Sequence, residues 1–308
     1  MRDLPFYGYK IFPFGRNDDS PRILKRYEIS AMFPLSTCRI RQNLHNHTVF
    51  SDGSFTPARL VQESLNGGLD ALGISDHFFT KKVFHRIDMA GWCSTVLPNY
   101  LQVAEETRKM EFENLKVWFG LEVDSCEVRL GCTIAQLPWP ELNRLDYLLF
   151  EYVGETGIGG LPLERLEELR QFARVPIVLA HPNPENWEET LPLNRVFDIL
   201  RKCGVALELP GGTRNPWPWT GRGSGPTSES GSESGSESGS EKCAGAGAGA
   251  GREAGLLKNV PLMIGCDTHE RIEDLCAIGR VLAFIEQNGL LEQLTDPERL
   301  APKWGGNP

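Results

Sequence analysis

Short apolar runs alternate with longer segments of mixed polarity along most of this chain. Most of the runs are apolar throughout rather than alternating, which is typical of parallel strands covered on both faces. The runs that predict strands are 39–45, 70–75, 116–122, 146–151, 175–181, 205–209 and 261–267.

Helices are predicted between these strands. Thr56 is a suitable N-cap, Pro57 suits the first helical position, and Gly67–Gly68 is a typical end. Further helices are predicted over 98–114, 163–174, 192–202 and 254–257, and a helical segment, 272–294, follows the last strand. Because strand and helix alternate, we expect an α/β fold whose parallel strands are joined by right-handed crossovers.

Two regions depart from this alternation. Residues 1–38 contain several prolines and no clear period, so we expect an irregular N-terminal extension. Residues 212–252 contain SESG repeats and an Ala-Gly tract, which have no large apolar side chains to bury. We therefore expect a long disordered loop inserted before the last strand of a domain over 39–294, with 295–308 as a C-terminal tail.

The composition narrows the functional classes. The 308 residues are 40% hydrophobic, which is enough for a large core, and carry a net charge of −9. No apolar run approaches the ~18 residues of a membrane span, so we expect a cytoplasmic protein without a membrane partner. The acidic balance does not favour binding to a nucleic acid backbone. The eight cysteines form no C-x-x-C pair and predict neither a zinc ribbon nor a disulfide framework.

Histidines and carboxylates gather where the predicted strands end. Because the carboxyl ends of parallel strands meet on one face of a barrel, we expect these side chains to converge there. In an extended segment residues i and i+2 point the same way, so His45 and His47 can share one ion. The strand-end residues are His45 with His47, Asp76 with His77, Glu122, Glu151, His181, Glu208, and Asp267 with His269.

Imidazole with carboxylate is a ligand set for Zn, Mn or Fe rather than for Ca or Mg. We interpret Asp76 as a residue that orients His77 or caps the following turn. His85 lies eight residues beyond His77. We expect it either on the surface or in contact with a metal ligand rather than with the ion itself.

Five motifs together resemble the PHP family, named for polymerase and histidinol phosphatase domains. The motifs are NLHNHTVFSDGSFTP (43–57), GLDALGISDH (68–77), GLEVD (120–124), VLAHP (178–182) and IGCDTH (264–269). The resemblance implies a distorted (β/α)7 TIM-like barrel that holds two to three divalent ions and hydrolyses phosphoesters. It assigns His45, His47, Glu122 and Asp267 to one ion, Glu122 and His181 to a second, and Asp52, His77 and His269 to a third.

One position departs from the family pattern. Many relatives supply a histidine to the second ion near the strand that reads DYLLFEYVGE here. Glu151 is the expected substitute, and Glu155 is the second choice. We expect Asp76 and Glu208 to support the site, and the positive charges that could meet a substrate phosphate are Lys81, Lys82, Arg86 and Arg214.

The sequence thus predicts a hydrolase that cleaves a small-molecule phosphoester through a metal-activated hydroxide. Two alternatives stay open at this stage. The same metal barrel could cleave a C–N bond as amidohydrolases do, or it could be a non-catalytic barrel whose metal only stabilises the fold.

Overall fold

Parallel strands form the centre of the described part of the chain, residues 40–212 and 254–304 of a computed structural model. Hydrogen bonding joins them in the orders β1-β2-β3 and β4-β5-β6-β7-β8. The strands are β1 Gln42–Asn43, β2 Ala71–Ile74, β3 Lys116–Phe119, β4 Glu122–Asp124, β5 Leu148–Glu151, β6 Ile177–Leu179, β7 Ala206–Pro210 and β8 Leu262–Gly265. Each expected strand is confirmed, and the run 116–122 becomes two strands.

The two sheets form one barrel. β3 and β4 are successive parts of one strand, because β2 and the residues after it hydrogen-bond along both of them. Gly120 N donates to Ile74 O at 2.8 Å, and Phe78 N donates to Glu122 O at 2.8 Å. At the other edge β1 meets β8, where Leu44 N donates to Ile264 O at 2.7 Å. With β3 and β4 taken together, seven strand positions among the described residues close the ring. The predicted (β/α)7 barrel is confirmed.

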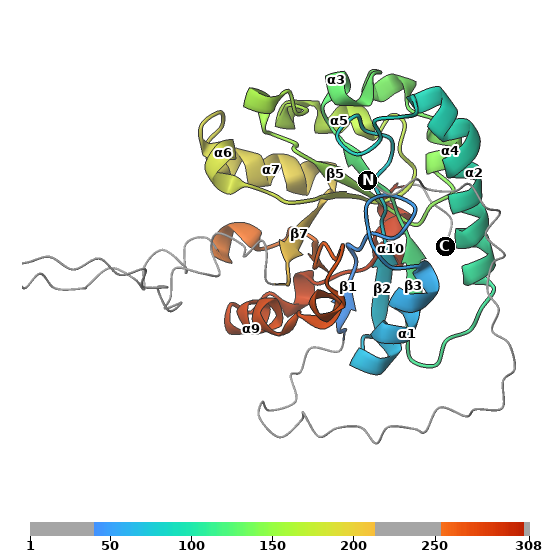
Figure 1. Cartoon of the computed structure of the whole chain (residues 1–308). Helices are drawn as coiled ribbons and strands as arrows, with labels where there is room; N and C mark the ends of the chain where they lie inside the picture. Colours follow the sequence, from blue (N-terminus) through green and yellow to red (C-terminus); the bar gives the residue numbers. More distant parts are fainter. Residues whose placement is uncertain (1–39, 213–253, 305–308) are drawn as a thin grey trace, which may run out of the picture. The chain divides into compact units, whose positions relative to one another are not determined.

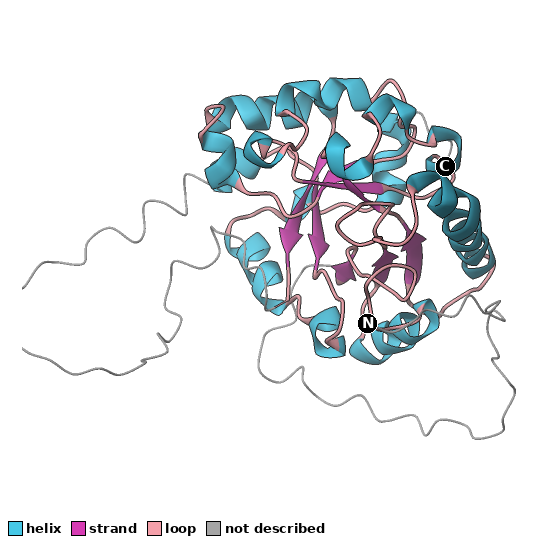
Figure 2. Cartoon of the chain, turned by 45° about the horizontal axis from the view of Figure 1, so that its top comes forward, coloured by secondary structure: helices cyan, strands magenta, loops and turns pink. Residues whose placement is uncertain are grey.

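Helices surround these strands (Figure 1, Figure 2). α1 and α2 lie beside β1 to β3, and α6 and α7 lie on the side of β5 and β7. None of the helices described is both long and apolar enough to cross a bilayer. The α-helices are α1 Pro57–Gly67, α2 Met89–Arg108, α3 Glu127–Leu130, α4 Trp139–Leu142, α5 Leu166–Leu169, α6 Pro184–Glu188, α7 Leu193–Cys203, α9 Gly279–Gln287 and α10 Pro297–Leu300. The 3₁₀ helices are η2 Ile134–Gln136, η3 Thr156–Ile158, η4 Leu163–Arg165, η5 Ile272–Cys276, η6 Leu291–Gln293 and η7 Ala301–Trp304.

Two helix predictions need correction. The helix expected over 98–114 begins earlier, because the Asp88 carboxylate caps it by accepting from Gly91 N at 2.8 Å, and Pro98 lies in its interior. The segment 163–174 forms only the short η4 and α5. By contrast, α1 begins and ends as predicted, with Thr56 as N-cap and Gly68 in the left-handed region at φ 68°.

Two described residues of the expected C-terminal tail, Thr295 and Leu300, contact the barrel. Thr295 N donates to Leu262 O at 2.9 Å, and the buried Leu300 joins the apolar cluster inside the barrel. The expected extension 1–38 and residues 213–252 of the expected insertion lie outside the described residues.

Tyr147 fills the interior of the barrel. Its side chain is fully buried, and its hydroxyl donates to Leu44 O at 2.6 Å. Two glycines make room for it: a Cβ at Gly73 would lie 2.2 Å from the Tyr147 hydroxyl, and a Cβ at Gly120 would lie 2.8 Å from its ring. The strands can therefore close around the Tyr147 side chain only because these two positions lack side chains.

We predict that Gly120→Ala destabilises the fold by about 1–3 kcal/mol, because the ring of Tyr147 is enclosed and cannot move aside. Urea unfolding measures this change in free energy. The matched control is Gly279→Ala, where an added Cβ meets no atom within 4 Å, and its effect should stay within about 0.5 kcal/mol. Equal stabilities for the two variants would contradict this packing argument.

Candidate metal centre

The predicted ligands come together at the carboxyl ends of the strands. His45 and His47 follow β1, His77 follows β2, and His181 follows β6. Glu122 begins β4, while Asp267 and His269 follow β8. The barrel thus brings side chains from both halves of the chain to one face, as the strand-end pattern indicates.

Five side chains form a first cluster: His45, His47, Glu122, His181 and Asp267. His45 Nε2 lies 3.0 Å from His47 Nε2 and 3.4 Å from Glu122 Oε1. His181 Nε2 lies 3.2 Å from the same Glu122 oxygen, and His47 Nε2 lies 3.2 Å from Asp267 Oδ1. These ring nitrogens and carboxylate oxygens all face a common space.

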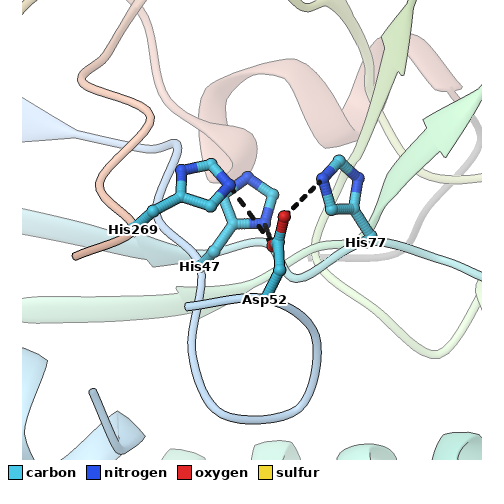
Figure 3. Close-up of side chains that lie close together, drawn as sticks. All are labelled: His47, Asp52, His77 and His269. Carbon is cyan, nitrogen blue, oxygen red and sulfur yellow. Dashed lines mark ion pairs between the residues drawn. The ribbon is translucent and has the colours of Figure 1, made fainter. Parts of the chain in front are cut away.

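Asp52 is the centre of a second cluster with His47, His77 and His269 (Figure 3). Its oxygens lie 3.3 Å from His269 Nε2, 3.6 Å from His47 Nδ1 and 3.7 Å from His77 Nε2. His47 therefore faces the first cluster with one ring nitrogen and the second cluster with the other. The two clusters are adjacent.

The donor atoms fit divalent ions. Two ligands at about 2.1 Å from a tetrahedral zinc lie roughly 3.4 Å apart, close to the separations found in both clusters. Among the described residues, several of these atoms are buried and have no hydrogen-bond partner, which is unfavourable unless a cation binds them. They are both Glu122 carboxylate oxygens and Asp267 Oδ1.

Without an ion, several of the candidate ligand histidines hold protons. Burial lowers the pKa of His45, His77 and His181, but the neighbouring carboxylates outweigh it and raise each pKa, so an ion that binds these rings displaces their protons. Burial alone would raise the pKa of Glu122, but the charges of His45 and His77 outweigh it and hold that pKa well below its usual range. Burial and the charge of His77 lower the pKa of His47 to about 3, so its imidazole is neutral. An ionised carboxylate and a neutral imidazole are the forms that bind metal ions.

Two of the candidate ligands have unusual backbone conformations. His181 has φ 47° and Asp267 has φ 51°, both in the left-handed region that residues other than glycine rarely adopt. Such conformations cost of order 1–3 kcal/mol and are typical of functional sites. Here they turn each side chain back over the end of its strand.

Glu208 contacts two of the candidate ligands on the side away from the first cluster. Its Oε1 lies 2.8 Å from His45 Nδ1, and its Oε2 accepts from the His181 backbone N–H at 2.8 Å. A proton on His45 Nδ1 leaves Nε2 free to face the first cluster. Glu208 thus orients His45 and holds the strained backbone of His181, a role that carboxylates commonly have behind metal-binding histidines.

Asp76 supports the loop that carries Asp52. It accepts hydrogen bonds from the Thr48 backbone N–H, the Thr48 hydroxyl and the Ser51 hydroxyl, each at 2.7 Å. The sequence suggested that Asp76 orients His77 or caps the following turn; instead these hydrogen bonds hold the turn at Thr48–Ser51, which comes before Asp76 in the chain.

Glu151 lies beside the clusters and is paired with a lysine. It groups with His77 and Glu122 rather than with His181, and its Oε1 is 4.0 Å from His77 Nδ1. Both of its oxygens accept from Lys82 Nζ, at 2.8 and 3.0 Å. Burial and the charge of Glu122 raise the pKa of Glu151 to about 7, and Lys82 opposes that rise.

Of the other expected phosphate-binding residues, Lys81 is exposed and donates to Val128 O at 3.3 Å, while Arg86 lies on the exposed surface. Arg214 lies outside the described residues. His85 is exposed and belongs to neither cluster.

Sequence reasoning missed Tyr152, whose hydroxyl accepts from Lys82 at 3.1 Å. Its place immediately after Glu151 at a strand end was the available signal.

Comparison with solved structures finds weak overall similarity. A histidinol phosphate phosphatase from Lactococcus lactis subsp. lactis Il1403, solved with zinc, L-histidinol and phosphate, shares 15% identity at a TM-score of 0.46, over 81% of this chain and 94% of that one. A chain in a cryo-EM structure of archaeal ribonuclease P with mature tRNA shares 10% identity at a TM-score of 0.44, over 85% and 91%. No curated protein sequence matches the chain.

A match to a protein-family model identifies the family of this domain. The model described as the PHP domain matches residues 43–184. This range begins just before the His45–His47 pair and ends after His181, so it includes most of the ligands of both clusters. The seven-stranded barrel and its ligand-bearing strand ends agree with the match, and the chain therefore contains a domain of the PHP family.

Proposed function

We propose that this chain is a metal-dependent hydrolase that cleaves phosphoester bonds. The observation that carries the proposal is the convergence of two adjacent histidine–carboxylate clusters at the carboxyl end of a PHP barrel, with buried donor atoms that lack hydrogen-bond partners. Buried carboxylate oxygens that accept no hydrogen bond are expensive to retain for stability alone, so a cation-binding role accounts for them best.

The clusters would hold two to three ions of Zn, Mn or Fe. The first cluster would bind through His45, His47, Glu122, His181 and Asp267, and the second through Asp52, His77 and His269. When bound, such ions lower the pKa of a coordinated water and neutralise phosphoryl charge. The chain's own contribution is orientation: Glu208 fixes the His45 ring, and Asp76 fixes the turn that presents Asp52.

A small-molecule phosphoester is the substrate class that we propose. The net charge of −9 does not favour the phosphate backbone of a nucleic acid, whose binding relies on lysine and arginine surfaces. A panel of phosphomonoesters and phosphodiesters tests the proposal, with an amide panel run on the same metal-loaded protein. Hydrolysis of amides but not of phosphoesters would replace it with an amidohydrolase activity.

We predict that EDTA abolishes hydrolysis and lowers the melting temperature, because ions that bind only the folded chain stabilise it by mass action. At 100 times the dissociation constant this stabilisation is about 2.7 kcal/mol, or roughly 5–10 °C. Mn or Zn should restore both properties better than Ca. Full turnover in protein shown by elemental analysis to be metal-free would refute the mechanism.

Asp267→Asn should reduce both bound metal and kcat, the latter by at least ~100-fold, because it removes a charged ligand. His85→Ala is the matched control: this histidine is exposed and lies outside both clusters, so metal content and rate should not change. Elemental analysis and steady-state kinetics give the two measurements. An Asp267 variant with normal metal content and rate would exclude that residue as a ligand.

Glu208→Gln should weaken metal binding by about 10–100-fold while the fold is kept, because the amide cannot hold His45 in one tautomer as firmly as the carboxylate does. Metal titration followed by calorimetry measures the affinity, and circular dichroism checks the fold. An unchanged affinity would show that His45 is oriented without Glu208.

A further inference from the structure

The pairing of Lys82 with Glu151 carries an inference about how this barrel supplies positive charge. Glu151 ends β5, and its side chain is only 1% exposed. Lys82 comes from the loop after His77 and reaches both carboxylate oxygens, at 2.8 and 3.0 Å. Its ammonium group also donates to the Tyr152 hydroxyl at 3.1 Å, so these three contacts of the ammonium lie at one strand end.

Neighbouring residues hold Lys82 in place. Its ammonium lies 5.0 Å from the centre of the Tyr152 ring, and the Arg129 guanidinium lies 4.7 Å from that ring centre. Arg129 in turn pairs with both oxygens of the buried Asp124, at 2.5 and 2.8 Å.

The backbone of Lys82 is tied to the same carboxylate. Lys82 N donates to the Thr80 hydroxyl at 3.3 Å, and that hydroxyl donates to Asp124 at 3.0 Å. Asp124 therefore anchors both ends of the arrangement, and the lysine position is built into the fold.

Charge balance requires a cation at this position. Glu151 and Glu122 are both buried and, together with His77, offer donor atoms within 4.8 Å of one another. Two buried carboxylates this close are unfavourable without a compensating positive charge. A metal ion bound to Glu151 would lie within a few Å of the Lys82 ammonium and would be repelled by it. The lysine and an ion thus compete for one carboxylate.

We propose that the ammonium of Lys82 takes the place of a metal ion at the His77–Glu122–Glu151 group, so that Glu151 is not a metal ligand in this protein. The inference rests on the proposed function in one respect, since it requires that divalent ions bind the remaining ligands. It differs from the sequence-based expectation that Glu151 replaces a ligand histidine. The barrel then contains one fixed cation beside its exchangeable ones.

The test is the metal-to-protein ratio after loading with Mn²⁺ and removal of free ion by gel filtration. Glu151→Gln should leave the wild-type ratio unchanged. Lys82→Met, which keeps an unbranched side chain one atom shorter and removes its charge, should raise the ratio by about one ion. The double variant Lys82→Met/Glu151→Gln should return to the wild-type ratio, because the vacated carboxylate is also gone.

Lys82→Arg is the matched control, since it keeps the positive charge and should keep the wild-type ratio. Circular dichroism and melting curves verify that each variant is folded. Loss of an ion in Glu151→Gln would overturn the proposal, as would an unchanged ratio in a folded Lys82→Met variant. A wild-type protein that binds no ion would overturn it too, because the lysine would then replace nothing.

The measurement separates this inference from the proposed function. Metal ratios need no turnover, so they can follow the expected order even if no phosphoester is cleaved, and only the proposed activity would then fail. Conversely, an active phosphoesterase that loses an ion in Glu151→Gln would retain the activity and reject the role of Lys82.

Discussion

The buried charge of Glu122 is the constraint on which the site depends. Its side chain is fully buried, and four imidazoles surround it at 3.0–3.4 Å: His45, His47, His77 and His181. Removing an isolated carboxylate from water costs several kcal/mol, so this charge is tolerable only where cations or polarised rings compensate it. The histidines reach it from three other strand ends, which makes the carboxylate the point around which those ends are arranged.

This arrangement divides the inside of the barrel into two layers. The lower layer is apolar and includes Leu44, Tyr147, Met263 and Leu300, whereas the ligands occupy the layer above. Gly265 lies between them, and a Cβ there would be 1.9 Å from Glu208 Oε1. Small residues thus make room for large groups in both layers: glycines beside Tyr147 below, and a glycine beside Glu208 above.

The strands and most ligands could be predicted from the sequence because each signal is local. An apolar run followed by histidine or a carboxylate marks both a strand and its functional end, as at His45, His181 and Asp267. The start of α2 was missed because Pro98 resembled the first residue of a helix, whereas the true N-cap is Asp88 and Pro98 lies inside the helix. The pairing of Lys82 with Glu151 joins residues 69 positions apart, and no local pattern indicates how the loop brings them together.

The ring of strands closes at a seam where β1 meets β8, and few residues make this contact. β1 has two residues, and the Cys266 N–H donates to Asn43 Oδ1 across 223 positions of the chain. Closing so long a loop carries a large entropic cost. Any ion held at once by His47 and Asp267 spans this seam and acts as a removable cross-link, much as a disulfide would. Amide hydrogens of β1 and β8 would then report metal occupancy by their exchange rates, while those of β5, which is far from this seam in the strand order, would respond less.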